Sequence, residues 1–255
     1  MAFYDLPKHE REKLSQNIQA ALLSDVQYNQ NNQFVKYFSD EDTYIRKCAY
    51  LAVGKLYKLE PSQQGQLVIT ITNLVSNPNF YVRQTAINAA GEIGIVNFAC
   101  IEKLMDIGLF DAHHAVRNAV IGSIKKMGEK NPEPVLAWAK LYLHHPDKEI
   151  RREICHGIEL RGRKYPQDIL PLLKTLQFDE TKRVSKTLVH VIGQIAYKKG
   201  CLPIVVNELN TWENKLLVKQ AWVEIIDVHE RYQNFAHLTQ QQAIAYIKKY
   251  AIEAD

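Results

Sequence analysis

The segment Asp147–Lys148–Glu149–Ile150–Arg151–Arg152–Glu153–Ile154 decides the fold, because its pattern recurs along the chain. In it an apolar anchor is followed by a basic residue and, four positions after the anchor, by a second apolar residue. The same anchor stands at Ile45, Val82, Val116, Ile150, Val184 and Val218. The intervals are 37, 34, 34, 34 and 34 residues, so the chain is built from an internal repeat.

Each anchor opens an apolar stripe with helical spacing. Four and eight residues after the anchors stand Ala49, Ala86, Val120, Ile154, Leu188 and Trp222, then Val53, Ala90, Ile124, Ile158, Ile192 and Ile226. This spacing lines one face of an α-helix and predicts the second helix of each repeat. Asn79, Asp147 and Thr181 precede it and can cap its free N–H groups.

A first helix is predicted before each turn. The candidate segments are Leu67–Val75, Ile101–Leu109, Pro134–Leu143, Ile169–Leu176 and Pro203–Leu209. A helix pair of this size buries its apolar faces only by stacking on its neighbours. We therefore expect an all-α fold, a right-handed α-solenoid (superhelix) of about six two-helix repeats.

The repeat resembles the HEAT repeat. Its second helix opens with Asp or Asn and continues with Ile-Arg or Val-Arg, at Asp42…Ile45–Arg46, Asn79…Val82–Arg83 and Asp147…Ile150–Arg151. The resemblance covers roughly residues 33–230. The Trp/Gly/Tyr pattern of tetratricopeptide repeats, which have a similar period, is absent.

The repeat predicts one continuous domain over residues 1–255. An N-terminal cap helix lies within 1–32, six repeats fill 33–231, and a C-terminal cap helix occupies 238–252, where Thr239 and Gln242 form a capping box. The longer first interval predicts an extra half-turn or loop near Glu60–Gln66.

Composition points to a cytoplasmic protein without a membrane span. The sequence is 46% hydrophobic and 24% charged, which is ordinary for a globular chain. No stretch approaches 18 apolar residues, and the charged start at residues 1–13 is not a signal peptide. The cysteines at 48, 100, 155 and 201 lack CxxC spacing, which predicts free thiols in a reducing compartment.

No cofactor or metal is expected from the sequence. The pairs His113–His114 and His144–His145 are adjacent residues, whose side chains diverge, and no HExxH or nucleotide-binding GxxxxGK[ST] motif is present. No catalytic residue is assigned.

Charge is concentrated in the middle of the chain. Residues 111–200 carry 17 basic and ten acidic side chains, a net charge of +7, whereas the whole chain carries +4. The two positions after each anchor are mostly basic, so two basic columns follow the repeats, and phosphate backbones are attracted to such surfaces. The predicted nucleic-acid contacts are Lys47, Arg117, Lys125, Lys126, Arg151, Arg152, Lys182, Arg183, Lys186 and His190.

A structural role competes with this interpretation. In HEAT repeats the Arg after the anchor commonly pairs with an Asp at the neighbouring turn. Such an arginine ladder would hold the repeats together and leave less charge for a ligand.

A second resemblance concerns roughly residues 100–230. Asn131–Pro132–Glu133, Trp138, Asp147…Ile150–Arg151–Arg152 and Lys182–Lys186 are similar to the AlkD/AlkC type of DNA alkylation-repair proteins. This resemblance implies a stack that holds duplex DNA in a positively charged groove.

The catalytic part of that family's site is not matched. Arg152 matches the family's active-site Arg, but the catalytic Asp falls on Arg117, and the aromatic positions fall on His113 or His114, on His190 and on Glu149. A guanidinium opposes the positive charge that builds on the sugar, whereas a carboxylate stabilises it. A shift of register would place Asp111 there instead.

Three functions follow as alternatives. The first is non-catalytic binding of double-stranded DNA by a relative of the alkylation-repair proteins. The second is a scaffold for a protein partner, which the modest pI of 8.7 and the acidic chain ends favour. The third is an alkylpurine DNA glycosylase.

Overall fold

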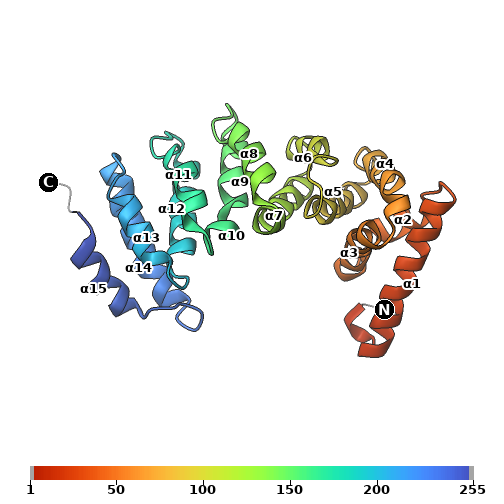
Figure 1. The fold of residues 1–255 in the computed structure, drawn as a ribbon, viewed down its shortest axis with the longest axis horizontal. Coiled ribbons are helices and arrows are strands. Elements are labelled where there is room, and N and C mark those ends of the chain that lie inside the picture. The colour runs from red at the N-terminus through yellow and green to blue at the C-terminus, as the bar shows by residue number, and fades with distance from the viewer. Residues whose placement is uncertain (1–2, 253–255) are drawn as a thin grey trace. The chain divides into compact units, whose positions relative to one another are not determined.

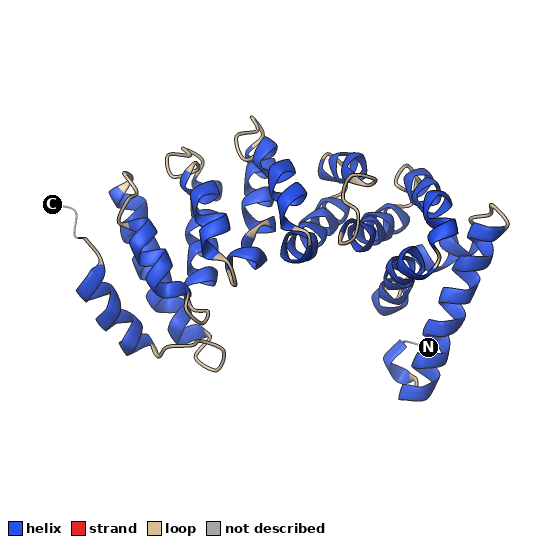
Figure 2. Cartoon of the chain, in the orientation of Figure 1, coloured by secondary structure: helices blue, strands red, loops and turns tan. Residues whose placement is uncertain are grey.

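The computed structural model describes residues 3–252, which are helical apart from turns and short loops (Figure 2). They divide between two compact units, Met1–Pro134 and Val135–Asp255. The predicted fold class, an all-α solenoid of two-helix repeats, is confirmed. The expectation of a single domain over residues 1–255 stays a prediction.

The first unit contains the N-terminal cap and the first three second helices (Figure 1). Its elements are η1 (Phe3–Asp5), α1 (Lys8–Gln27), α2 (Asn32–Phe38), α3 (Thr43–Leu59), η2 (Pro61–Gln63), α4 (Gln64–Leu74), α5 (Phe80–Gly94), α6 (Glu102–Leu109) and α7 (His114–Lys130). The short helix η2 is the extra half-turn that the 37-residue interval predicts. Within the unit α3 packs on α5, and α5 packs on α7.

The second unit contains the remaining repeats and the C-terminal cap (Figure 1). Its elements are α8 (Pro132–Tyr142, which begins at the unit boundary), α9 (Lys148–Gly157), α10 (Glu159–Gly162), α11 (Pro166–Lys174), α12 (Lys182–Ala196), α13 (Cys201–Leu209), α14 (Lys215–Arg231) and α15 (Gln240–Tyr250). The second helices α9, α12 and α14 lie in succession, and α15 packs on α14. The predicted capping box of Thr239 and Gln242 begins α15.

The anchor stripes form the core, with exceptions at the ends of the repeat array. Val82, Val116 and Val184 are buried, as are the stripe residues four positions after them. Ile45, in the first repeat, is only half-buried. Trp222 and Ile226, in the last repeat, are also only half-buried. The stripe therefore leaves an apolar surface at the end of α14.

The turns before the second helices share one hydrogen-bonding scheme. Asp42, Asn79 and Asp147 cap their helices by accepting from the N–H two residues on, as predicted. Thr181 is an exception: its side chain makes no cap hydrogen bond. Its hydroxyl instead accepts from Nη2 of Arg151, at 3.1 Å.

The second helix of the fourth repeat is interrupted. The stripe predicts a helix that runs through Ile158, but α9 ends at Gly157 and α10 begins at Glu159. Glycine at this point lowers the helical propensity. The break separates His156 from Glu159, which face each other across it.

Candidate functional site

The arginines one position after the anchors hold the turns together. Nη1 of Arg83 donates to the carbonyl oxygens of Asn77 and Pro78 at 2.9 and 3.0 Å. Nε and Nη2 of the same side chain donate to the two carboxylate oxygens of Asp111 at 2.7 and 3.1 Å. One guanidinium thus ties its own turn to the turn of the next repeat.

The same contacts recur at Arg151 in the second unit. Its Nη1 donates to the carbonyl oxygens of His145 and Pro146, and its other nitrogens bind Asp179, 28 residues along the chain. The side chains of Arg151 and Asp179 are 15% and 7% exposed, so the pair is mostly shielded from water. We call Arg46, Arg83, Arg117 and Arg151 the arginine ladder.

Arg46 and Arg117 complete the ladder through backbone contacts. Nη1 of Arg46 donates to the carbonyl oxygens of Asp40 and Glu41. Nη1 of Arg117 donates to those of Asp111 and Ala112, at 2.8 and 3.1 Å. The structure thus confirms the predicted Asp–Arg ladder for Arg83 and Arg151, and gives all four arginines a turn-holding role.

The charges of the ladder stabilise one another. The hydrogen bonds that Arg83 donates to Asp111 raise the pKa of Arg83, and those that Arg151 donates to Asp179 raise the pKa of Arg151. Burial alone would raise the pKa of Asp111, but the Arg83 guanidinium and the His113 N–H outweigh burial and lower it. The pKa of Asp179 is lowered in the same way, by Arg151 and the Thr181 N–H acting against burial.

The ladder ends where Ser185 replaces the arginine. A serine side chain is too short to reach the next turn. Gln177 takes over: its Oε1 accepts from the N–H groups of Glu213 and Asn214 at 2.8 and 3.1 Å, and its carbonyl oxygen accepts from Nδ2 of Asn214. The last turn is therefore held by amide contacts.

Several of the other predicted nucleic-acid contacts pair with carboxylates. Nζ of Lys126 lies 2.7 Å from Glu92. Arg152 and Arg183 both bind Glu149, each at 3.0 Å. Nδ1 of His190 lies 3.3 Å from Glu224.

The remaining predicted contacts are lysines in different settings. Lys125 is half-buried and takes part in an interaction. Lys47, in the first unit, and Lys182 and Lys186, in the second, are exposed. The structure thus brings Arg152 and Arg183 together at Glu149, and Lys182 and Lys186 onto successive turns of α12. The role of all ten residues in binding a nucleic acid stays a prediction.

Asp111 already has partners. The register shift considered above would use its carboxylate to stabilise a sugar cation, but both of its oxygens accept from Arg83. Oδ1 also accepts from the His113 N–H at 2.7 Å. A carboxylate neutralised in this way gives little stabilisation to a second cation.

The basic columns of the sequence do not indicate a groove that lies between α14 and α15. It has a volume of about 370 Å³ and is lined by Lys215, Val218, Lys219, Trp222, Ile247, Lys248, Ala251 and Ile252. We call it the terminal groove. Trp222 lies at a stripe position that is buried in the preceding repeats, but here its side chain is half-buried. The sequence signal for this groove is a tryptophan at a stripe position of the last repeat, close to Lys215 and Lys219.

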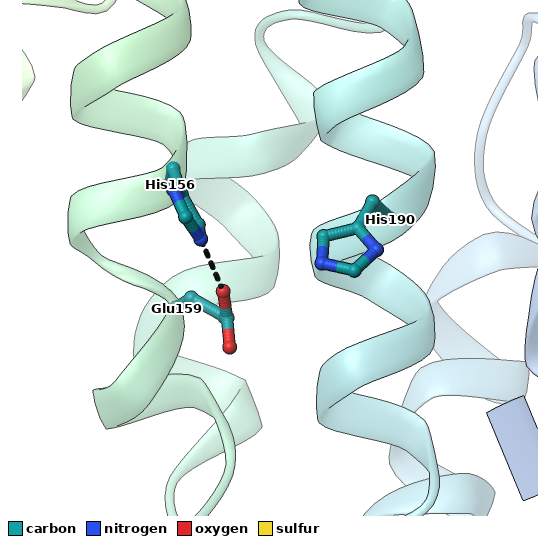
Figure 3. A group of neighbouring side chains, drawn as sticks. All are labelled: His156, Glu159 and His190. Atoms are coloured by element: carbon teal, nitrogen blue, oxygen red, sulfur yellow. Dashed lines mark ion pairs between the residues drawn. The ribbon is translucent and has the colours of Figure 1, made fainter. Parts of the chain in front are cut away.

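A group of metal-ligand type lies on neighbouring helices of the second unit (Figure 3). His156 lies in the last turn of α9, Glu159 begins α10 and His190 lies on α12. One ligand atom from each lies within 4.8 Å of the other two. The sequence predicts no metal here, because His156 and His190 stand 34 residues apart and form no local ligand motif.

The four cysteines differ in how deeply they are buried. Cys155 and Cys201 are buried and Cys48 and Cys100 are half-buried, all as free thiols. Burial raises the pKa of Cys155 and of Cys201, which keeps both protonated at neutral pH. Within residues 3–252, no helix combines the length and the apolar character needed to cross a bilayer.

Comparison with known proteins identifies repeat proteins as structural neighbours. No family model matches the sequence, and no curated protein matches it. Among solved structures, a chain of the complex in which Kap95p binds RanGDP is 14% identical, with a TM-score of 0.47 over 85% of this chain and 31% of that one. A chain of the Pds5–Scc1 complex is 15% identical, with a TM-score of 0.49 over 97% of this chain and 39% of that one.

A designed armadillo repeat protein in complex with the peptide (KR)4 is 20% identical, with a TM-score of 0.36 over 76% of this chain and 97% of that one. These neighbours are of the HEAT and armadillo type. The chain spans about a third of the length of the first of them.

Proposed function

We propose that the chain is a protein-interaction scaffold that holds a segment of a partner protein in the terminal groove. The observation that carries this proposal is Trp222, an aromatic side chain of the repeat stripe left accessible between α14 and α15. Tryptophan is enriched among residues that dominate binding energy, because it offers a large rigid surface with a polar N–H. Its position in a groove, instead of on a flat surface, favours an inserted segment.

The lining of the groove defines the partner's chemistry. Val218, Trp222 and Ile247 provide an apolar floor, and Lys215, Lys219 and Lys248 surround it. Among residues 3–252, no carboxylate lies within ion-pair distance of these three lysines. We therefore expect an acidic segment that inserts one large apolar side chain, because its carboxylates complement the lysines.

The arginine ladder supports a protein partner indirectly. Much of the basic character that suggested a phosphate-binding surface belongs to Arg46, Arg83, Arg117 and Arg151, whose donors serve the turns. An arginine committed to a carbonyl and a carboxylate must give up those contacts to bind a phosphate. The ladder thus lowers the number of cations that are free to neutralise a backbone.

Selection from a displayed peptide library tests the proposal. We expect the wild-type protein to enrich peptides in which Asp and Glu flank a Trp, Phe or Leu. Trp222→Ala removes the apolar contact and Lys219→Glu reverses one charge. Each variant should weaken binding of the selected peptides at least tenfold, since truncation of a central aromatic side chain costs about 2 kcal/mol or more.

Val223→Ala provides the matched control. Val223 is 69% exposed on the same helix but does not line the groove, so this variant should bind like the wild type. Circular dichroism of each variant shows whether the fold is retained. Enrichment of basic peptides would rule out the groove as the binding site. So would Trp222→Ala and Lys219→Glu variants that bind the selected peptides as tightly as the wild type.

Nucleic-acid binding is the second candidate function. It is favoured by Lys182 and Lys186, which are exposed one turn apart on α12 and have no ion-pair partner among residues 3–252. With Arg183 they place three cations within the first five residues of one helix. Under this candidate the chain would be a non-catalytic DNA binder of the kind that the resemblance to alkylation-repair proteins implies. Glycosylase activity has less support, because Arg83 already engages Asp111.

A further inference from the structure

We propose that His156, Glu159 and His190 form a binding site for a divalent transition-metal ion, with zinc as the expected occupant. Two imidazoles and one carboxylate are a donor set that zinc accepts in tetrahedral sites, with a fourth position for water or a further ligand. All three residues belong to the second unit, and the proposal does not depend on which partner the scaffold binds.

The repeat itself brings the two histidines together. His156 and His190 are 34 residues apart and stand six positions after the anchors Ile150 and Val184. Because α9 packs against α12, equivalent positions of the two helices become neighbours, and the two imidazole rings lie 6.3 Å apart. The next equivalent position is Glu224 on α14, so the same column continues as a carboxylate.

Glu159 supplies a buried carboxylate at the edge of this column. Its side chain is 2% exposed, and burying a carboxylate is costly unless cations or donors surround it. One oxygen, Oε1, accepts from Nη2 of Arg163, which Gln194 also binds at 2.8 Å. The other oxygen, Oε2, lies 3.2 Å from Nε2 of His156.

That spacing is compatible with a shared metal ion. Ligand atoms bound at about 2.0–2.1 Å in a tetrahedral site lie about 3.3 Å apart, which follows from that bond length and angle. The 3.2 Å between Nε2 of His156 and Oε2 of Glu159 therefore already suits a common ion. All three ligand atoms lie within 4.8 Å of one another, so His190 has to move closer to complete the tetrahedral spacing.

A neighbouring carboxylate orients His190. Nδ1 of His190 lies 3.3 Å from Oε1 of Glu224, and Arg231 binds the same oxygen at 3.2 Å. The other ring nitrogen therefore faces His156 and Glu159 (Figure 3). A carboxylate on the second nitrogen is the usual support for a metal-ligating histidine, because it fixes the ring and raises its basicity.

The bound ion would join α9, α10 and α12 across the break at Gly157. The two histidines are 35% and 41% exposed, so an ion can enter from solvent. Metal binding to the folded state stabilises that state by mass action. Zinc should therefore raise the midpoint of thermal unfolding of this unit in addition to binding.

Titration with zinc in competition with a chromophoric chelator tests the site. The wild-type full chain should bind one equivalent of zinc. His156→Ala and His190→Ala should each lower the affinity for this equivalent at least tenfold. His144→Ala removes an exposed histidine outside the cluster and should leave this equivalent unchanged. Both ligand variants remove half-exposed side chains, and circular dichroism verifies that they fold.

Thermal unfolding provides the second measurement. Zinc should raise the melting temperature of the wild type and of His144→Ala, but not that of the double variant His156→Ala/His190→Ala. The proposal is overturned if the wild type binds no zinc, or if the double variant binds zinc as tightly as the wild type.

Discussion

Arg151→Ala is expected to lower the free energy of unfolding of the second unit by about 3–5 kcal/mol, the usual loss when one partner of a shielded ion pair is removed. The substitution leaves Asp179, whose side chain is 7% exposed, without the guanidinium that binds both of its oxygens. It also removes the donor to the carbonyl oxygens of His145 and Pro146. Urea unfolding monitored by circular dichroism measures the loss.

Arg183→Ala is the matched control for this loss. Arg183 also binds a carboxylate, that of Glu149, but its side chain is 65% exposed. An exposed pair contributes about 0–1 kcal/mol, so this variant should unfold close to the wild-type midpoint. Equal losses in the two variants would show that Arg151 has no special structural role, and would restore it as a residue available for a ligand.

Gly91→Ala and Gly122→Ala should change stability in opposite directions. A methyl group at Gly91, on α5, would lie 2.4 Å from Oγ and 2.6 Å from Cβ of Ser123, on α7. The two helices must separate to admit it, which we expect to cost about 1–3 kcal/mol. At Gly122 an added Cβ meets nothing within 4 Å, so the helix gains up to about 1 kcal/mol from alanine.

The pair of glycine variants is measured in one urea series on the full chain. Both residues lie in helices of the first unit, so both substitutions raise helical propensity in the same way. Opposite changes in the free energy of unfolding must therefore come from packing. Stabilisation by Gly91→Ala would mean that α5 and α7 are not packed through this glycine and Ser123.

The periodic features of the fold could be predicted from the sequence. The anchors and their stripes locate the second helices, because a helical stripe depends on residues a few positions apart. Asn79 and Asp147 predict their caps for the same local reason. Thr181 makes no side-chain cap bond, and its hydroxyl accepts from Arg151 of the previous repeat. That contact spans 30 residues, so a local pattern does not predict it.

The candidate sites depend on contacts that a linear pattern leaves open. A basic residue after each anchor is compatible with a ladder and with a phosphate-binding column, and only the positions of Asp111 and Asp179 distinguish the two. The 34-residue column of His156 and His190 is present in the sequence, but Glu159 joins it only because the helix breaks at Gly157. The terminal groove depends on how much of Trp222 the last helix covers.

The central claim is that this chain binds a protein segment, and not a nucleic acid, as its main ligand. Fluorescence anisotropy tests it with two labelled probes on the same protein sample at several salt concentrations: the best peptide from the library selection and a duplex of roughly 20 base pairs. Each phosphate contact contributes about −0.9 to the slope of log K against log salt. Two variants distinguish the surfaces: Lys182→Ala/Lys186→Ala alters the basic face of α12, and Trp222→Ala alters the terminal groove.

We expect the peptide to bind more tightly than the duplex at every salt concentration. Trp222→Ala should weaken peptide binding at least tenfold, whereas Lys182→Ala/Lys186→Ala should leave it unchanged. The duplex should bind weakly, with a slope shallower than about −2, corresponding to about two phosphate contacts. The contrary result is tight duplex binding with a slope of about −3 or steeper that Lys182→Ala/Lys186→Ala reduces and Trp222→Ala does not. That outcome would make the basic face of α12 the functional surface.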